Sequence, residues 1–252
     1  VASRICIPTA GKVPDYEHFH NVAFQMIYCL RGWVKVVYED QGPEFKMTKG
    51  DCVLQPSTIR HRVLESSAGL EVLELGAPAQ HMTSADPDAK LPDSTEPNPV
   101  RVYGRGQSFV RHQSKLAEWT MLDKQHSGSE SGGSAFEQRD VGIENATNGA
   151  VDVTVVRCKA EEKQKSDDAA ESSATSRCRE SGKMCHKDRL AFVYVSEGNI
   201  TVLVYSNAEG GLDVHRLQEG DSLLLPMASS HAFKASDEKY CELIRVLLPE
   251  DF

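Results

Sequence analysis

Long apolar runs and an excess of positive charge are both missing from this sequence. No window approaches the roughly 18 consecutive apolar residues of a membrane-spanning helix, and no charged-then-apolar signal peptide opens the printed chain. With 28 Lys and Arg against 37 Asp and Glu, the formal net charge is −9, which argues against nucleic acid or an anionic membrane as main partner. We therefore expect a cytoplasmic protein that binds neither nucleic acid nor a membrane.

Paired cysteine motifs are also absent. The seven cysteines are odd in number and irregularly spaced, and none forms a CxxC pair. This pattern favours reduced thiols in a cytosol-like compartment over a disulfide scaffold. No helix-turn-helix pattern is present that would indicate a transcription regulator.

A sustained helical period is missing too, and short β-type runs take its place. These runs are rich in valine, leucine and aromatic residues and are separated by turn signals. They occur in an N-terminal set, from FQMIYCLRG to LEVLEL, and again in a C-terminal set, from LAFVYVSEG to CELIRVLL. The pattern predicts an all-β barrel or sandwich.

The two sets form an internal repeat. The stretch KGDCVLQPSTIRH at 49–61 aligns with EGDSLLLPMASSH at 219–231. In both, a Gly-Asp pair precedes a proline by the same interval, and a histidine follows five residues after that proline. Two copies of one β unit are therefore expected.

The repeat and the composition predict the domain boundaries. We expect a first β unit over residues 1–80 and a second over residues 136–252. The Pro-, Asp- and Ser-rich start of residues 81–135 predicts a linker and covering segment, with a flexible loop at SGSESGG. Residues 160–183 have almost no large apolar side chain and are predicted to be a disordered insertion in the second unit.

Three histidines and a glutamine of the first copy are spaced to bind a metal. In a strand, His18 and His20 project from the same side, and Gln25 follows across a short turn. His61 opens another strand after the Gly-Asp…Pro turn. Three imidazoles and one amide oxygen would then converge on a divalent ion. The alternative is a set of polar residues that line the barrel without a metal.

The same residues match the two sequence motifs of the cupin superfamily. The chain resembles a bicupin, with two cupin (double-stranded β-helix or jelly-roll) barrels, over roughly residues 10–80 and 136–250. The resemblance implies a bound divalent ion, with Fe(II) favoured and nickel, manganese, copper or zinc as alternatives. The matched positions are His18, His20, Gln25 and Gly32 in the first motif and Gly50, Pro56 and His61 in the second.

Two positions depart from these motifs. Gln25 stands in place of the acid, and Thr58 replaces the glycine before His61, which predicts a reshaped turn. With four neutral ligands, a bound ion would keep its full positive charge and attract an anionic or chelating substrate. Some metal-binding cupins carry glutamine at this place.

Three further residues lie near the predicted ligands in the sequence. Tyr28 is a candidate catalytic acid or hydrogen-bond donor, although a strand tyrosine more often packs in a core. Arg60 and Arg62 flank His61, so strand alternation turns them to the opposite side, where surface ion pairs are expected.

The second copy keeps fewer ligand residues. His186 and His231 remain as weak candidates for a second metal site, with methionine or water as a further ligand. Loss of the metal, with the barrel serving as scaffold and interface, is the reading we favour. Aligned on Gly198 and Gly32, the pairs are Met184 with His18, His186 with His20, Ala191 with Gln25, and His231 with His61.

Two classes of function follow from the resemblance. One is a metal-dependent dioxygenase, quercetinase-like or related, acting on a small enolic or phenolic substrate in the first barrel; isomerase, lyase or decarboxylase chemistry at the same site is the alternative. The other is a non-enzymatic cupin that binds a small molecule or sugar, or a storage protein. One intact ligand set suits an enzyme better than a storage role. A monomer or a homodimer is expected.

Overall fold

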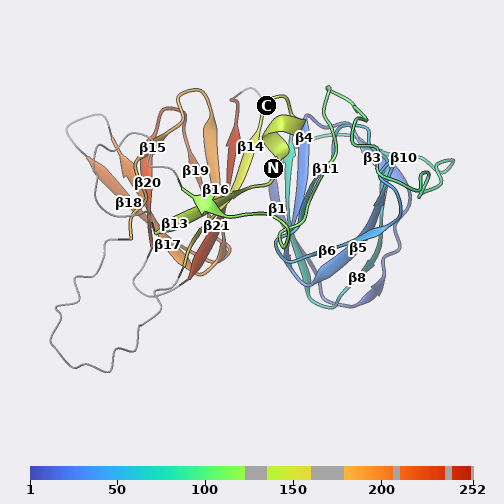
Figure 1. The fold of residues 1–252 in the computed structure, drawn as a ribbon, viewed down its shortest axis with the longest axis horizontal. Helices are drawn as coiled ribbons and strands as arrows, with labels where there is room; N and C mark the ends of the chain where they lie inside the picture. Colours follow the sequence, from blue (N-terminus) through green and yellow to red (C-terminus); the bar gives the residue numbers. More distant parts are fainter. Residues whose placement is uncertain (123–134, 160–178, 207–210, 236–239, 251–252) are drawn as a thin grey trace. The chain divides into compact units, whose positions relative to one another are not determined.

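The computed structural model describes residues 1–122, 135–159, 179–206, 211–235 and 240–250, and the regular secondary structure of these residues is almost entirely β-strand (Figure 1). The predicted all-β class is therefore confirmed. Within these ranges no helix has the length and apolar character that crossing a membrane requires.

The described residues divide into two compact units. Unit 1 contains Val1–Ala117 and Val141–Val151, and unit 2 contains Glu118–Asp140 and Asp152–Glu250. The short helix α1 (Ile143–Ala146) belongs to unit 1.

Unit 1 is made of two antiparallel sheets. Its strands are β1 (Ala2–Ile7), β2 (Gly11–Lys12), β3 (His18–His20), β4 (Phe24–Arg31), β5 (Trp33–Tyr38), β6 (Phe45–Thr48), β7 (Cys52–Leu54), β8 (His61–Ser66), β9 (Leu70–Ala77), β10 (Thr83–Ala85) and β11 (Val110–His112). One sheet has the order β1-β9-β4-β7-β11, and the other has the order β10-β3-β8-β5-β6 with β2 paired to β8.

Alternate residues of both sheets form the core of unit 1. Cys29, Val34, Val36, Val53 and Val72 belong to this core, and none of them is more than 7% exposed. Complete burial of a valine-sized side chain stabilises a fold by ~1.5–3 kcal/mol, so this apolar interior fixes which strand face points inward. The histidines of the candidate site lie on strands of the same interior.

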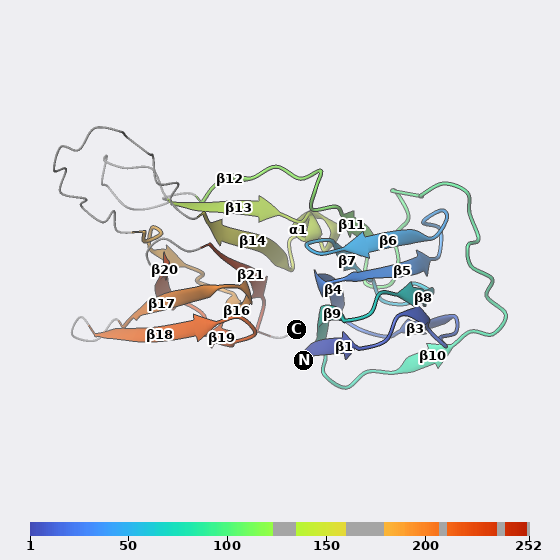
Figure 2. The ribbon, with the colours of Figure 1, turned by 90° about the horizontal axis from the view of Figure 1, so that it is seen from below.

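Unit 2 is also made of two antiparallel sheets. Its strands are β12 (Thr120–Met121), β13 (Phe136–Asp140), β14 (Asp152–Cys158), β15 (Met184–Cys185), β16 (Leu190–Glu197), β17 (Asn199–Tyr205), β18 (Leu212–Gln218), β19 (Ser222–Leu225), β20 (Ser230–Ala235) and β21 (Cys241–Leu248). One sheet has the order β12-β13-β14-β21-β16-β19 and the other β15-β20-β17-β18; Figure 2 shows β17 and β18 side by side.

The Gly-Asp turn of the sequence repeat has the same geometry in both units. Gly50 and Gly220 have φ angles of 89° and 90°, in the left-handed region that glycine adopts without a steric penalty. The carboxylates of Asp51 and Asp221 each accept a hydrogen bond from the backbone N–H three residues earlier, at 2.8 and 3.0 Å. The repeat in the sequence is thus a repeat in structure.

The turn before the motif histidine holds a non-glycine residue in a left-handed conformation in both units, and a turn reshaped by Thr58 stays a prediction. Thr58 and its counterpart Ala228 have φ angles of 71° and 59°. Their N–H groups donate to the carbonyls of His20 and His186, at 2.9 and 2.7 Å. These bonds hold both residues in a conformation that costs a non-glycine residue about 1–2 kcal/mol.

The boundaries of the units differ from those expected at residues 80 and 135. Residues 81–117 belong to unit 1, because β10 pairs with β3 and β11 pairs with β7. The following segment 118–140 belongs to unit 2 through the pairing of β12, β13 and β14. These short strands cover sheet edges, which would otherwise present unpaired backbone groups.

Most of the predicted insertion, residues 160–178, and the SGSESGG loop lie outside the described residues. The last five residues of the predicted insertion, 179–183, include residues that are buried and hydrogen-bonded in unit 2. Arg179 and Ser181 are 4% and 6% exposed, and Ser181 exchanges hydrogen bonds with the backbone of Phe233 at 2.7 and 2.8 Å. The disorder prediction is therefore wrong for this end, where the backbone pairs with unit 2.

Candidate metal centre

The structure brings the three predicted histidines of unit 1 together. His18 and His20 project from β3, and His61 is the first residue of β8 and the cross-strand partner of His18. One side-chain nitrogen of each lies within 4.8 Å of the other two. Strand alternation brings the first two side chains together, and the antiparallel register adds the third.

The Nδ1 atom of each imidazole is held by a neighbour. His18 Nδ1 lies 2.8 Å from the Tyr16 carbonyl, and His61 Nδ1 lies 3.1 Å from the Ile59 carbonyl. A carbonyl only accepts, so both Nδ1 atoms donate, and in the neutral ring Nε2 is then the nitrogen that has a lone pair. His20 Nδ1 lies 2.9 Å from the Thr83 hydroxyl. Such partners fix the tautomer and ring orientation of metal-binding histidines.

Burial keeps two of the three rings neutral. Burial, and next the proximity of His18, lower the pKa of His20 to about 4 and that of His61 to about 3. Near neutral pH these rings therefore carry no proton on the nitrogen that a metal would use. These two rings are therefore ready to bind a cation without first losing a proton.

A buried polar network lies behind His61. The Gln25 amide is 2% exposed, and its Nε2 donates to the Glu74 carboxylate at 2.8 Å. A carboxylate only accepts, so Glu74 fixes the amide with its oxygen turned away from Glu74. That oxygen accepts from Gln55 Nε2 at 3.3 Å, and the same nitrogen lies 3.3 Å from His61 Nε2. Gln25 as a metal ligand stays a prediction, because its oxygen is hydrogen-bonded to Gln55.

Two tyrosine rings lie beside the histidines: Tyr16 is 5.5 Å from His18 between ring centroids, and Tyr38 packs on His61. Tyr28 lies three residues after Gln25 on β4, so alternation directs it to the opposite face, and it is 1% exposed. Tyr38 stacks on His61 with 5.5 Å between ring centroids and 23° between planes. Its hydroxyl, whose pKa is raised by burial, donates to Gln55 Oε1 at 2.6 Å. The pairing of β5 with β8, absent from the local sequence pattern, places it there.

Other residues of the site carry no sequence pattern that identifies them. His81 is half-buried with its ring 5.3 Å from that of His20, so a fourth imidazole lies beside the cluster. Asp15 Oδ1 lies 3.5 Å from His18 Nδ1 and gives that ring a carboxylate neighbour. Thr83 is brought to His20 only by the pairing of β10 with β3. His81 and Thr83 are distant in sequence from the motifs, and Asp15, three residues before His18, occupies no motif position.

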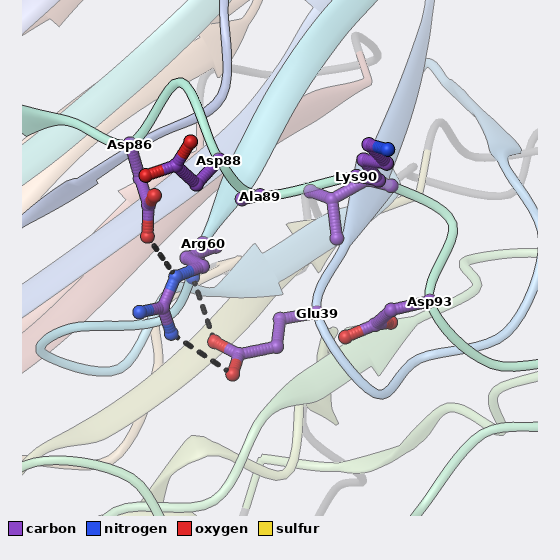
Figure 3. A pocket seen from close by; sticks show the side chains of 8 residues that line it. Glu39, Arg60, Asp86, Asp88, Ala89, Lys90 and Asp93 are labelled. Atoms are coloured by element: carbon purple, nitrogen blue, oxygen red, sulfur yellow. Dashed lines mark hydrogen bonds and ion pairs between the residues drawn. The ribbon is translucent and has the colours of Figure 1, made fainter.

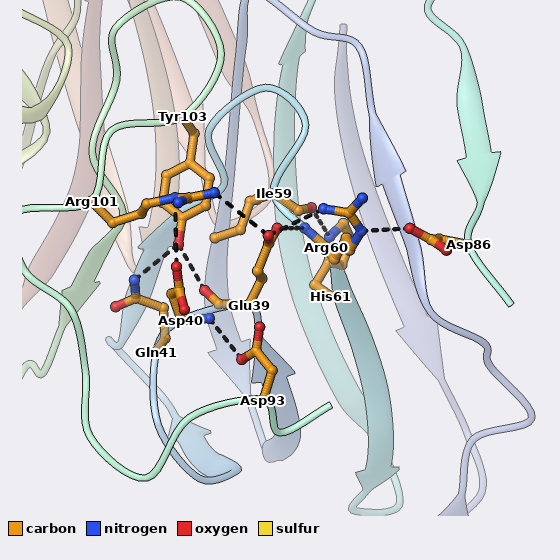
Figure 4. Close-up of polar contacts among 10 residues, drawn as sticks. All are labelled: Glu39, Asp40, Gln41, Ile59, Arg60, His61, Asp86, Asp93, Arg101 and Tyr103. Atoms are coloured by element: carbon orange, nitrogen blue, oxygen red, sulfur yellow. Dashed lines mark hydrogen bonds and ion pairs between the residues drawn. The ribbon is translucent and has the colours of Figure 1, made fainter. Parts of the chain in front are cut away.

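Arg60 and Arg62 face away from the histidines, as predicted. Arg62 pairs with Glu17 at 3.2 Å. Arg60 lies between Glu39, at 3.1 Å, and Asp86, at 2.5 Å, beside His61 in the chain (Figure 4). These contacts raise the pKa of Arg60 and lower that of Asp86. Both arginines therefore serve in ion pairs and are not aimed at the candidate site.

A pocket of about 440 Å³ surrounds Arg60 (Figure 3). Its acidic side chains outnumber its basic ones, and Arg60 is already paired, so the pocket does not suit an anionic substrate. The charged residues that line it are Glu39, Arg60, Asp86, Asp88, Lys90 and Asp93.

Unit 2 repeats the scaffold of the site but not its chemistry. Met184 is the cross-strand partner of His231, as His18 is of His61. The rings of His186 and His231 are 5.6 Å apart. Within the described ranges, the only group of three or more potential His, Cys, Asp or Glu ligands is the one in unit 1.

Replacing Thr83 by valine is expected to weaken divalent-metal binding roughly 10–100-fold, the usual cost of losing a partner that orients a ligand. Valine keeps the shape of threonine but removes the hydroxyl that holds His20 Nδ1. Chelator competition with Mn(II) measures the change, and Thr120→Val at an exposed position is the control. Unchanged affinity in Thr83→Val would show that His20 needs no orienting partner.

Residues 4–75, which lie within unit 1, match the family model described as the cupin domain, and this part of the chain is a cupin domain. A search of curated proteins found none that matches this sequence.

Solved structures resemble the chain over nearly its whole length. A tryptophan-to-phenylalanine variant of Bacillus subtilis oxalate decarboxylase is 14% identical, with a TM-score of 0.59, and covers 99% of this chain and 68% of its own. A second structure of the same enzyme, from work on its Mn(II) centres, is 13% identical with a TM-score of 0.56. The match covers 100% of this chain and 69% of that one. The formate complex of Lactobacillus farciminis oxalate decarboxylase is 11% identical with a TM-score of 0.57. The match covers 98% of this chain and 76% of that one. At these identities the likeness shows the fold alone.

Proposed function

We propose that unit 1 binds one divalent metal ion through His18, His20 and His61 and acts on a small carboxylate substrate. The observation that carries this proposal is the convergence of three imidazole nitrogens within 4.8 Å, with Nδ1 of each ring held by a neighbour. A bound divalent ion would polarise a carboxylate oxygen as a Lewis acid and hold a chelating substrate in place.

The charge of the site favours an anionic substrate. The three histidines and the amide of Gln25 bring no negative charge to the ligand set, so an ion held there would keep most of its charge. Glu74 is one hydrogen bond further away, at 2.8 Å from the Gln25 amide nitrogen. Gln55 Nε2, 3.3 Å from His61 Nε2, is placed to donate a hydrogen bond to a substrate oxygen beside His61.

The reaction class we propose is decarboxylation of a small dicarboxylate, with Mn(II) as the metal. Support comes from the similar structures, which are named as oxalate decarboxylases and in one case for their Mn(II) centres. A carboxylate substrate also suits manganese, which prefers oxygen ligands. Fe(II) and a dioxygenase reaction on an enolic or phenolic substrate stay predictions, since the named structures above are decarboxylases.

Metal content and gas exchange together test this function. Purified protein reconstituted with Mn(II) or with Fe(II) is expected to hold about one ion per chain and to release CO₂ from oxalate without stoichiometric O₂ uptake. O₂ consumed one-to-one with a phenolic substrate would establish the dioxygenase instead. One bound ion with neither reaction would point to a binding module.

A further inference from the structure

The interior of unit 2 carries a buried arginine where unit 1 carries an acid. Arg245 of β21 pairs across the sheet with Val193 of β16, and Glu74 of β9 pairs with Ile27 of β4 in the same register. Arg245 is 7% exposed. The charge at this repeated position is therefore reversed between the two units.

Arg245 lies against the residues that correspond to the metal ligands of unit 1. Its Nη1 lies 3.4 Å from Met184 Sδ, and Met184 is the cross-strand partner of His231. A thioether is a weak acceptor for a guanidinium N–H. A positive charge at this place opposes the binding of a metal cation, so the two remaining histidines are not a reduced copy of the first site.

Three nitrogen atoms around this point are buried without a hydrogen-bond partner in the described part of the chain. They are Nε of Arg245, Nε2 of His186 and Nε2 of His231. The His231 side chain has no solvent exposure, and Asp152, the acidic neighbour of Arg245, is 4.0 Å from Nη2. Buried polar atoms are nearly always hydrogen-bonded, so this cluster is matched to a ligand that supplies oxygen atoms.

The hydrogen-bonding character of the cluster defines the ligand. Arg245 offers a charged donor, which suits a carboxylate. His231 Nδ1 lies 3.2 Å from the Ser229 carbonyl and donates to it, so Nε2 of the neutral ring is an acceptor that suits a hydroxyl group. We propose that unit 2 binds a small hydroxycarboxylate, with its carboxylate on Arg245 and its hydroxyl group donating to His231.

The electrostatics of the cluster agree with this assignment. Burial, and next the charge of Arg245, lower the pKa of His186 to about 4. Burial and Arg245 likewise lower the pKa of His231. Both rings are neutral near pH 7, which leaves the guanidinium as the cation of the cluster and the imidazoles as polar, uncharged partners. This site does not depend on the reaction proposed for unit 1.

Calorimetric titration with glycolate and acetate tests the proposal. The full chain carrying His61→Ala is used, so that the candidate metal centre of unit 1 does not compete. We expect one glycolate site per chain, with acetate binding roughly tenfold or more weaker because it lacks the hydroxyl donor. Arg245→Met is expected to weaken glycolate binding by a similar factor, and the exposed Arg216→Met is expected to leave it unchanged.

Nitrogen-15 NMR of the histidine rings gives a readout that does not need the Arg245 variant to fold. Glycolate is expected to shift the His231 Nε2 resonance of the His61→Ala chain, and acetate is expected to shift it much less. The proposal is overturned if glycolate does not bind, or if it binds without moving this resonance. Binding of Mn(II) that His186→Ala abolishes would also overturn it, since unit 2 would then be a metal site.

Discussion

Replacing His61 by alanine is expected to lower the divalent-metal affinity of the protein more than a hundredfold. The change removes one of three converging imidazoles, and loss of a mere orienting partner already costs 10–100-fold. Plasma mass spectrometry after dialysis measures the metal per chain, and competition with a chelator measures the affinity. We expect about one ion per chain in the unchanged protein and almost none in the variant.

Three controls separate the loss of a ligand from a nonspecific effect of histidine removal, from misfolding and from metal binding by unit 2. His215→Ala removes an exposed histidine of β18 and is expected to keep the metal. His61 is 5% exposed, so thermal unfolding of the metal-free variant must show that the fold survives the cavity. If His61→Ala keeps its ion and His186→Ala loses it, the metal centre belongs to unit 2.

Replacing Gln25 by glutamate is expected to make the stability of the metal-free protein fall as the pH rises above about 4. The new carboxyl would be buried against Glu74, which now accepts the Gln25 amide at 2.8 Å. Burial and a like charge both raise the folded-state pKa above the unfolded value of about 4.3. The variant therefore keeps its stability below pH ~4 and loses it as the pH approaches the raised value.

The expected loss is about 3 kcal/mol by pH 8, since each unit of pKa shift corresponds to about 1.4 kcal/mol. Urea unfolding in the presence of a chelator, at pH 4 and pH 8, measures it against the unchanged protein. Gln113→Glu, at an exposed loop position, is the matched control and should show little pH dependence. A Gln25→Glu protein with unchanged pH dependence would mean that the new carboxyl is neither buried nor in contact with Glu74.

The same variant tests the charge argument for the substrate. A carboxylate at position 25 would offset part of the charge of a bound ion, so anionic ligands are expected to bind more weakly to the metal-loaded variant. Tighter anion binding in Gln25→Glu would contradict the idea that a neutral ligand set selects an anionic substrate.

Features that depend on neighbours within a few residues could be predicted from the sequence. His18 and His20 face one side because strand residues alternate, and the Gly-Asp turns recur because the backbone conformation at Gly50 and Gly220 suits glycine. The turn at Thr58 is an exception, because its hydrogen bond to the His20 carbonyl outweighs the residue's own preference.

What surrounds the histidines was decided by strand pairing. Tyr38 and Thr83 reach the site only because β5 pairs with β8 and β10 with β3, and Glu74 meets Gln25 through the pairing of β9 with β4. The boundaries of the units differ from those expected for the same reason, because β10 and β11 pair with strands of unit 1.

The sequence by itself determined the all-β class, the repeat and which three histidines form the candidate site. Strand alternation and turn conformation are local properties of the chain. Only the tertiary structure decided the hydrogen bonds that orient the imidazoles and the reversal from Glu74 to Arg245 between the units. The physical reason is that both depend on the register between strands distant in sequence. Packing of the whole core sets that register.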